Sequence, residues 1–132
     1  MANGKAQIER PLSPHLQIYR WNWTMAMSIF HRVTGTANYL GTVLVAVWLL
    51  AMATGPGAYE AVQNFFGSII GRVILFGYTW SLMHHMLGGV RHLVWDFGYG
   101  MEPATRMNMA RFTLFGSAAL TLLLWLLAYI VR

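Results

Sequence analysis

The chain has 132 residues, of which 57% are hydrophobic and only 10% charged, and its formal net charge is +5. Because soluble domains usually carry about a quarter charged residues, this composition excludes an ordinary soluble protein and indicates a single domain in a membrane. Cysteine is absent, which excludes disulfides, thiolate-held iron–sulfur clusters and covalently attached c-type haem within this chain. The positive charge is typical of basic residues at one membrane face, so we expect no nucleic-acid partner.

Residues 1–20 are polar and contain Pro11 and Pro14, which disfavour helix in the residues that precede them. They are predicted to form a cytoplasmic N-terminal segment, either a surface tail or a segment docked on a soluble partner. The sequence shows neither a secretory signal peptide nor the Arg- and Ser-rich pattern of a mitochondrial transit peptide. This favours a bacterial protein.

Three apolar runs predict an all-α integral membrane protein with transmembrane helices at about residues 25–53, 68–95 and 110–131. Each run is long enough, because roughly 20 apolar residues cross the hydrocarbon. We expect a short connection between the first two helices and a polar connection over residues 96–109. Seven of the nine Lys and Arg residues fall on the side of the N-terminus and the second connection, which places the N-terminus in the cytoplasm.

Two adjacent histidines, His84 and His85, lie inside the second apolar run. An ionisable residue at such a place is costly and is a functional candidate by default. Neighbouring helical residues diverge by about 100°, so the two cannot hold one haem iron between them. The first run has no histidine at matching depth. If a haem is bound here, its second axial ligand must come from another chain.

His85 is the better ligand candidate because it shares a helix stripe with Gly88, Gly89 and His92. Glycines on that stripe would let a flat porphyrin approach the helix, and His92 with Arg91 would meet its propionates. The alternative is that the glycines serve ordinary helix packing and the histidines hydrogen-bond to neighbouring side chains. The pattern alone leaves both interpretations open.

Ser28 and Arg32 lie one helical turn apart near the start of the first apolar run. A hydroxyl and a guanidinium at the membrane boundary suit an oxygen-rich ligand with an apolar tail, such as a quinone head group, or a haem propionate. The alternative is that Arg32 reaches out to a lipid phosphate.

Three motifs occur in order along the chain: RPLSPHL at residues 10–16 with Tyr19, SIxHRxTG at residues 28–35, and HxxxGxRHxxxD at residues 85–96. Together they closely resemble the cytochrome b membrane-anchor family of succinate dehydrogenase, respiratory complex II. The resemblance covers most of the chain. It implies a bacterial inner-membrane subunit in a complex with a flavoprotein, an iron–sulfur protein and a second small anchor, with which it forms a helical bundle.

The resemblance also implies a role for each matching residue. His85 would be an axial ligand of haem b, paired with a histidine of the second anchor. Ser28 and Arg32 would belong to the ubiquinone site, and His31, Arg32 and His92 would surround the haem propionates. No residue of this chain would be catalytic, because the flavin and iron–sulfur chemistry of the tricarboxylic acid cycle enzyme lies on the partners. His84 receives no role.

Two further functions are also compatible with the sequence. The chain could be the haem b anchor of a quinol:fumarate reductase, in which electrons flow in the opposite direction. It could also be a haem-free transport or structural protein in which His31, Arg32, His84 and His85 line a proton or ion path. The second alternative predicts a complex without a Soret band.

Overall fold

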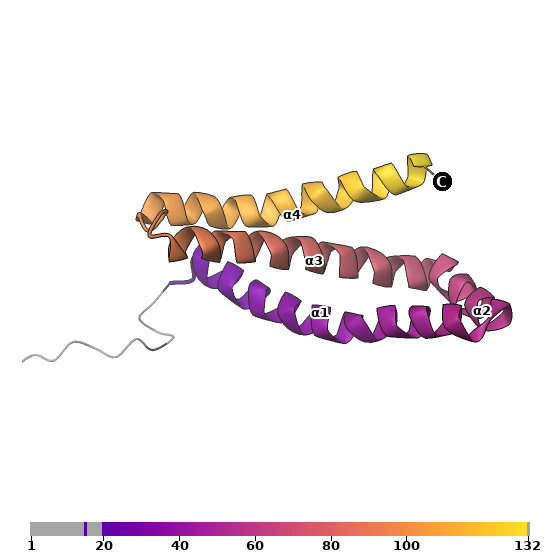
Figure 1. Cartoon of the computed structure of the whole chain (residues 1–132). Coiled ribbons are helices and arrows are strands. Elements are labelled where there is room, and N and C mark those ends of the chain that lie inside the picture. Colours follow the sequence, from indigo (N-terminus) through magenta and orange to yellow (C-terminus); the bar gives the residue numbers. More distant parts are fainter. Residues whose placement is uncertain (1–14, 16–19, 132) are drawn as a thin grey trace, which may run out of the picture.

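The structure, a computed structural model, describes residue 15 and residues 20–131, and these residues form four helices. The helices are α1 (Trp23–Thr54), α2 (Pro56–Gly67), α3 (Ile69–Asp96) and α4 (Pro103–Val131). Figure 1 shows α1, α3 and α4 running alongside one another, with α2 forming the bend between α1 and α3. The expected all-α class is confirmed for this part of the chain. The expected N-terminal segment lies outside the described residues, except for the exposed His15 and Arg20.

Two helices, α1 and α4, are each long and apolar enough to cross a membrane. Helix α3 meets the same condition only together with α2, from which it is bent by 79°. The described residues therefore contain two candidate spans, or three if the bent pair counts as one. Large apolar side chains are exposed all around the bundle, which is typical of helices that face lipid.

Helix α1 begins and ends at residues suited to these positions. The side chain of Asn22 accepts a hydrogen bond from the Met25 backbone N–H at 2.9 Å, as an N-cap does. At the other end Gly55 has φ 132°, a conformation that side chains disfavour, so glycine is needed to stop the helix. Pro56 then opens α2, where its missing N–H costs nothing.

The short connection expected between the first two spans is itself helical, because residues 56–67 form the 12-residue helix α2. Ser68 divides α2 from α3: its hydroxyl donates to the Phe65 carbonyl at 2.6 Å and accepts from the Gly71 N–H at 3.1 Å. Gly71 is required at this bend, because a Cβ atom there would collide with the Phe65 backbone. Pro56 is the first residue of α2, a position at which proline is favoured.

Helix α4 begins at Pro103, not at about residue 110 as expected. The connection is therefore only residues 97–102, and Gly98 and Gly100 allow its tight turn through positive φ angles of 79° and 73°. Arg106 and Arg111, expected in or beside a loop, lie on the first turns of a helix. A proline favours this early start because its fixed φ suits the first turn.

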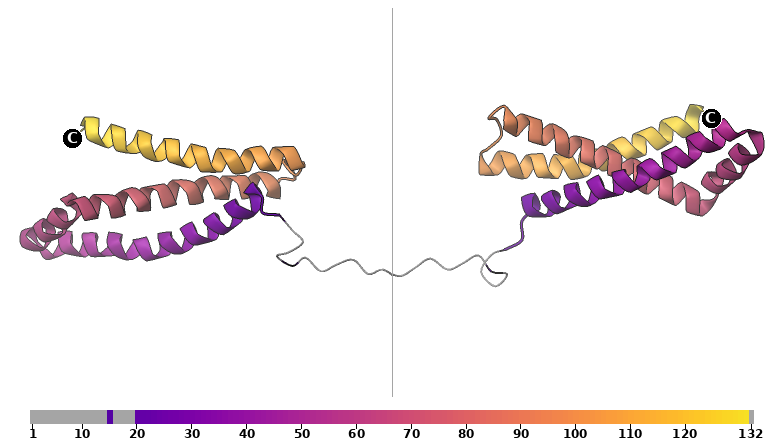
Figure 2. Two further views of the ribbon diagram at one scale, coloured as in Figure 1. Left: turned by 180° about the vertical axis from the view of Figure 1, so that it is seen from behind. Right: turned by 60° about the horizontal axis from the view of Figure 1, so that its bottom comes forward.

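The helices contact one another mainly through small and polar side chains. Ser81 of α3 donates hydrogen bonds to Asn38 Oδ1 at 2.7 Å and to the Thr34 carbonyl at 3.1 Å on α1. On α4, Thr113, Ser117 and Thr121 form a fully buried stripe. Such residues let helix backbones approach closely in a membrane. Figure 2 shows that α4 diverges from α3 toward the C-terminus, so this packing is closest at the opposite end.

Candidate functional site

The start of α1 lies beside the end of α3 (Figure 1), and three histidines of these two helices meet near this end of the bundle. They are His31 of α1 with His85 and His92 of α3, hereafter the histidine cluster. The ring centroids of His31 and His85 are 4.0 Å apart, and those of His31 and His92 are 5.2 Å apart. The structure thus brings together three of the residues that the sequence analysis singled out.

Within this cluster, the backbone of α1 fixes the ring of His85. Its Nδ1 lies 3.1 Å from the carbonyl oxygen of His31, and Thr34 Oγ1 is 3.5 Å away. Because a carbonyl can only accept, Nδ1 carries the proton and donates it, which leaves Nε2 with a free lone pair. The ring is half-buried. A histidine held this way, with Nδ1–H on a backbone carbonyl, has the arrangement typical of a metal ligand.

His84 has the same tautomer, but its side chain is fully buried between the helices. Its Nδ1 lies 3.3 Å from Ser117 Oγ of α4. The Ser117 hydroxyl already donates to the Leu114 carbonyl at 2.8 Å, so it accepts from His84 Nδ1. The free Nε2 of His84 is buried without a hydrogen-bond partner among the described residues. The ring centroid of His84 lies 6.0 Å from that of Phe30 and 5.2 Å from that of Trp80. Of the two histidines, only His85 therefore has a ligand atom near the protein surface.

The glycines around the histidine cluster behave differently from one another. A Cβ atom on Gly88 would collide with the His31 ring, so this glycine accommodates His31. The expectation that Gly88 faces a porphyrin was wrong for this reason, because α1 already covers it. Gly89 has open space around it, with nothing within 4 Å of a Cβ atom. Gly35 was not singled out as a site residue, although a Cβ there would lie 3.0 Å from Cε1 of His85.

Ser28 and Arg32 flank His31 in sequence, but the structure does not bring them into the histidine cluster. Both side chains are exposed on α1, whereas His31 faces α3. Their one-turn spacing places them on a common strip of the helix surface. A ligand that contacts them would approach from outside this chain.

Arg91 and His92 point to different surroundings. His92 is exposed and edge-on to Trp95, with ring centroids 5.1 Å apart. Arg91 is only 4% exposed and belongs to the buried stripe of α3 that includes His84 and Gly88. Its guanidinium carbon lies 5.2 Å from the Trp95 ring centre. Trp95 was not among the predicted site residues, although its spacing of three and four residues from His92 and Arg91 puts it on their side of the helix.

Three buried nitrogen atoms at this end lack a hydrogen-bond partner among the described residues: Arg91 Nε, Trp95 Nε1 and His31 Nδ1. Arg91 and Trp95 can only donate. An unpaired buried polar group is costly, commonly about 1–3 kcal/mol. This end of the chain therefore offers donors for an acidic or carbonyl oxygen supplied by a ligand or a partner.

The described residues contain no group of three or more His, Cys, Asp or Glu side chains that could hold a bare metal ion. The histidine cluster thus differs from a closed protein site such as tetrahedral zinc. It offers one anchored imidazole nitrogen, an open glycine at Gly89 and nearby donors. This donor set fits an iron porphyrin, which His85 would hold as the one ligand from this chain.

Comparison with known proteins points to one family. Residues 6–124 match the family described as succinate dehydrogenase/fumarate reductase transmembrane subunit. Over 114 residues the chain is 42% identical to the succinate dehydrogenase cytochrome b556 subunit of Paracoccus denitrificans, covering 86% of this chain and 88% of that protein. The cytochrome b556 subunit of Rickettsia prowazekii is 33% identical over 89% of this chain and 91% of its own length. The mitochondrial cytochrome b560 subunit of Sus scrofa is 42% identical over 70% of this chain, but only 56% of that protein is covered.

Proposed function

Because this chain belongs to the family of succinate dehydrogenase cytochrome b membrane-anchor subunits, we propose that it anchors a succinate:ubiquinone oxidoreductase. In this proposal the chain binds haem b jointly with a second anchor subunit and forms part of the ubiquinone-reduction site. A flavoprotein and an iron–sulfur subunit carry out the oxidation of succinate. The complex resides in a bacterial inner membrane, as the bacterial relatives suggest.

The observation that carries the haem proposal is the anchored ring of His85. Its Nδ1 is hydrogen-bonded to the His31 carbonyl at 3.1 Å, and its Nε2 remains free at a half-buried position. The adjacent His84 is fully buried, so this chain would hold the haem iron through His85 alone, and a histidine of the second anchor would be the other ligand. The haem, when bound, provides one-electron redox chemistry at its iron.

The residues around His85 would hold the rest of the haem. Gly89 leaves room for a flat ring beside α3. Arg91 and the cluster residues His31 and His92 would supply positive charge and N–H donors for the two propionates, and Arg91 Nε and His31 Nδ1 have no other partner among the described residues. Arg32 lies outside the histidine cluster and would add a further positive charge from the exposed face of α1. Pairing with a carboxylate would stabilise the buried Arg91, since an unpaired buried charge is strongly disfavoured.

Ser28 and Arg32 would bind the head group of ubiquinone. The Ser28 hydroxyl can donate a hydrogen bond to a quinone carbonyl oxygen, and the Arg32 guanidinium can stabilise negative charge that develops there on reduction. Both residues are exposed at the same end as the histidine cluster. The site would be completed by partner chains, because both side chains are exposed among the described residues.

The membrane topology follows from the distribution of charge. We infer three spans, with α2 and α3 forming the second, and a cytoplasmic N-terminus. Arg20, Arg32, Arg91, Arg106 and Arg111 lie near the end with the histidine cluster, whereas Arg72 lies at the other end. The positive-inside rule places the arginine-rich end in the cytoplasm, where soluble partner subunits would dock.

The deciding experiment is a reduced-minus-oxidised visible spectrum of the purified complex, comparing wild type with His85→Ala and His84→Ala. We expect a low-spin b-type spectrum that His85→Ala abolishes or alters and His84→Ala preserves. Absence of haem from the wild-type complex would support the haem-free alternative. A spectrum that depends on His84 instead would overturn the ligand assignment.

The family description also names fumarate reductase, so a quinol:fumarate reductase anchor is the second candidate. The residues of this chain suit either direction of electron flow, because the direction depends on the quinone potential and the catalytic partners. Steady-state rates of succinate oxidation and fumarate reduction by the purified complex, measured with the native quinone, distinguish the two functions.

A further inference from the structure

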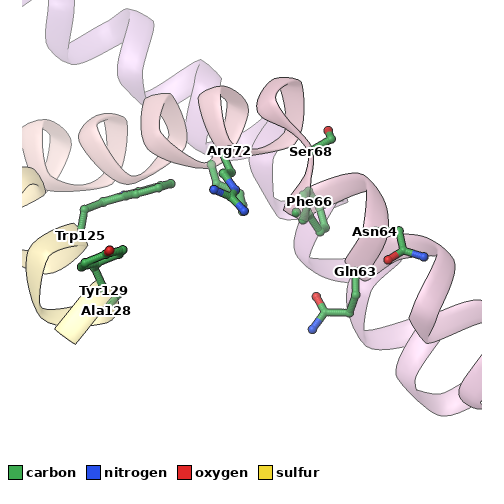
Figure 3. Close-up of a pocket in the computed structure, with 10 residues that line it drawn as sticks. Gln63, Asn64, Phe66, Ser68, Arg72, Trp125, Ala128 and Tyr129 are labelled. Carbon is green, nitrogen blue, oxygen red and sulfur yellow. The ribbon is translucent and has the colours of Figure 1, made fainter. Parts of the chain in front are cut away.

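At the end of the bundle opposite the histidine cluster, three helices enclose an open groove of about 820 Å³. The 79° bend between α2 and α3 forms one side, and the C-terminal part of α4 forms the other. Figure 3 shows the Arg72 side chain pointing from the first turn of α3 into this space, with Trp125 and Tyr129 of α4 across from it and Gln63 of α2 below. The groove exists because α4 diverges from α3 toward the C-terminus (Figures 1 and 2).

The lining of the groove divides into a polar and an apolar part. Among the described residues that line it, Arg72 is the only charged one and none carries a carboxylate. Neutral polar groups come from Gln63, Asn64 and Tyr129, and the floor between α3 and α4 is formed by apolar side chains that include Leu75 and Ala128. An unopposed cation beside an apolar floor is complementary to an anion that carries a hydrocarbon chain.

The position of the groove along the spans matches the head-group layer of a bilayer. Trp and Tyr are enriched at that level, and Trp125 and Tyr129 occupy the last turns of α4. Trp125 is fixed there by a hydrogen bond from its Nε1 to Thr79 Oγ1 at 3.3 Å, so the wall of the groove is held in place. Below this level the space between diverging helices faces hydrocarbon, which cannot hydrate it.

We propose that this groove is a binding site for a membrane phospholipid. Its phosphate lies at Arg72, where Gln63 and Tyr129 donate further hydrogen bonds, and one acyl chain lies over Leu75 and Ala128 between α3 and α4. Charge complementarity selects the phosphate, and the apolar floor selects the attached chain. The site is separate from the proposed haem and quinone functions, so it stands or falls independently of them.

The test uses the complete complex, purified in detergent and stripped of lipid, with native mass spectrometry as the readout. The probes are dihexanoyl phosphatidylglycerol and dihexanoylglycerol, which carry the same acyl chains but differ in the phosphoglycerol head group that contains the phosphate. We expect the wild type and Arg72→Lys to retain the phosphate-bearing lipid at least tenfold better than the phosphate-free lipid. Arg72→Gln should lose this preference. Arg106→Gln, which removes an exposed arginine at the opposite end, is the matched control and should keep it.

A second variant tests the apolar half of the site without changing its charge. Ala128→Trp should fill the floor of the groove and lower retention of phosphatidylglycerol at least tenfold, while helix content measured by circular dichroism stays unchanged. It also decides the matter if Arg72→Gln fails to assemble. Equal retention of both probes by the wild type, or full retention by Ala128→Trp, would overturn the proposal. Release of a partner subunit rather than of lipid from Arg72→Gln would show that a protein carboxylate occupies the groove, and would overturn it as well.

Discussion

The imidazole ring of His31 on α1 lies flat against that of His85 on α3, with an interplanar angle of 4° and ring centroids 4.0 Å apart. The His31 backbone carbonyl also accepts the Nδ1–H of His85 at 3.1 Å. One residue of α1 thus determines both the tilt of the candidate ligand and the nitrogen that it presents. Helix α1 therefore serves the proposed haem site as a positioning element, in addition to carrying the proposed quinone residues.

Replacement of Gly88 by alanine should destabilise the contact between α1 and α3. The new Cβ would collide with the His31 ring, and forcing extra volume into a packed contact typically costs about 1–3 kcal/mol. Gly77→Ala is the control on the same helix, because a Cβ there meets nothing within 4 Å in this chain. Thermal unfolding of the purified complex should show a lower midpoint for Gly88→Ala than for Gly77→Ala. Equal midpoints would argue against the observed contact between the His31 ring and Gly88.

Gly35→Ala should change the environment of the haem without removing the ligand. The added Cβ would lie 3.0 Å from Cε1 of His85, so the imidazole ring must tilt to accommodate it. We expect a shifted low-spin signal in electron paramagnetic resonance, with haem still bound. Gly77→Ala on α3 is the matched control, because its Cβ has open space, and its spectrum should equal that of the wild type. An unchanged spectrum in Gly35→Ala would contradict the proposed ligand.

His84 should contribute to stability and not to haem ligation. Ser117→Ala removes the acceptor of its Nδ1–H and should cost about 1 kcal/mol, since interhelical hydrogen bonds in membranes contribute only modestly. His84→Ala leaves a cavity at a fully buried position and should cost more, about 2–4 kcal/mol. Chemical denaturation of the complex measures both losses. The haem spectrum should persist in each variant, and loss of haem from Ser117→Ala would instead assign His84 a direct role.

Substitution of Arg32 should separate the two half-reactions of the complex. Arg32→Gln removes the positive charge proposed to stabilise the reduced quinone oxygen, so ubiquinone reduction should fall at least about tenfold, which corresponds to about 1.4 kcal/mol. Succinate oxidation with an acceptor that takes electrons from the soluble subunits should stay unchanged. Ser28→Ala should show a smaller loss of the same kind. An equal fall in both activities would indicate failed assembly and not a quinone site.

Local rules predicted much of this fold, and tertiary contacts account for the rest. The divergence of neighbouring helical residues is visible in the structure, where His84 packs against α4 and His85 against α1. The role of Gly88 could not be foreseen in the same way, because it depends on which face of α1 meets α3. Helix α2 was missed because a Gly-Pro-Gly run such as residues 55–57 predicts the end of one helix without showing that another begins there, and Pro103 was not recognised as the first residue of α4.

The dependence of α3 on its neighbours has a consequence for how the protein is made. The helix that holds His84, His85 and Arg91 does not qualify as a span by itself, whereas α1 and α4 do. Charged and polar residues raise the cost of partitioning a nascent helix from the translocon into lipid. During synthesis α3 would therefore depend on its apolar neighbours to remain in the bilayer, so the residues proposed for haem binding are also those that make biogenesis of this chain vulnerable.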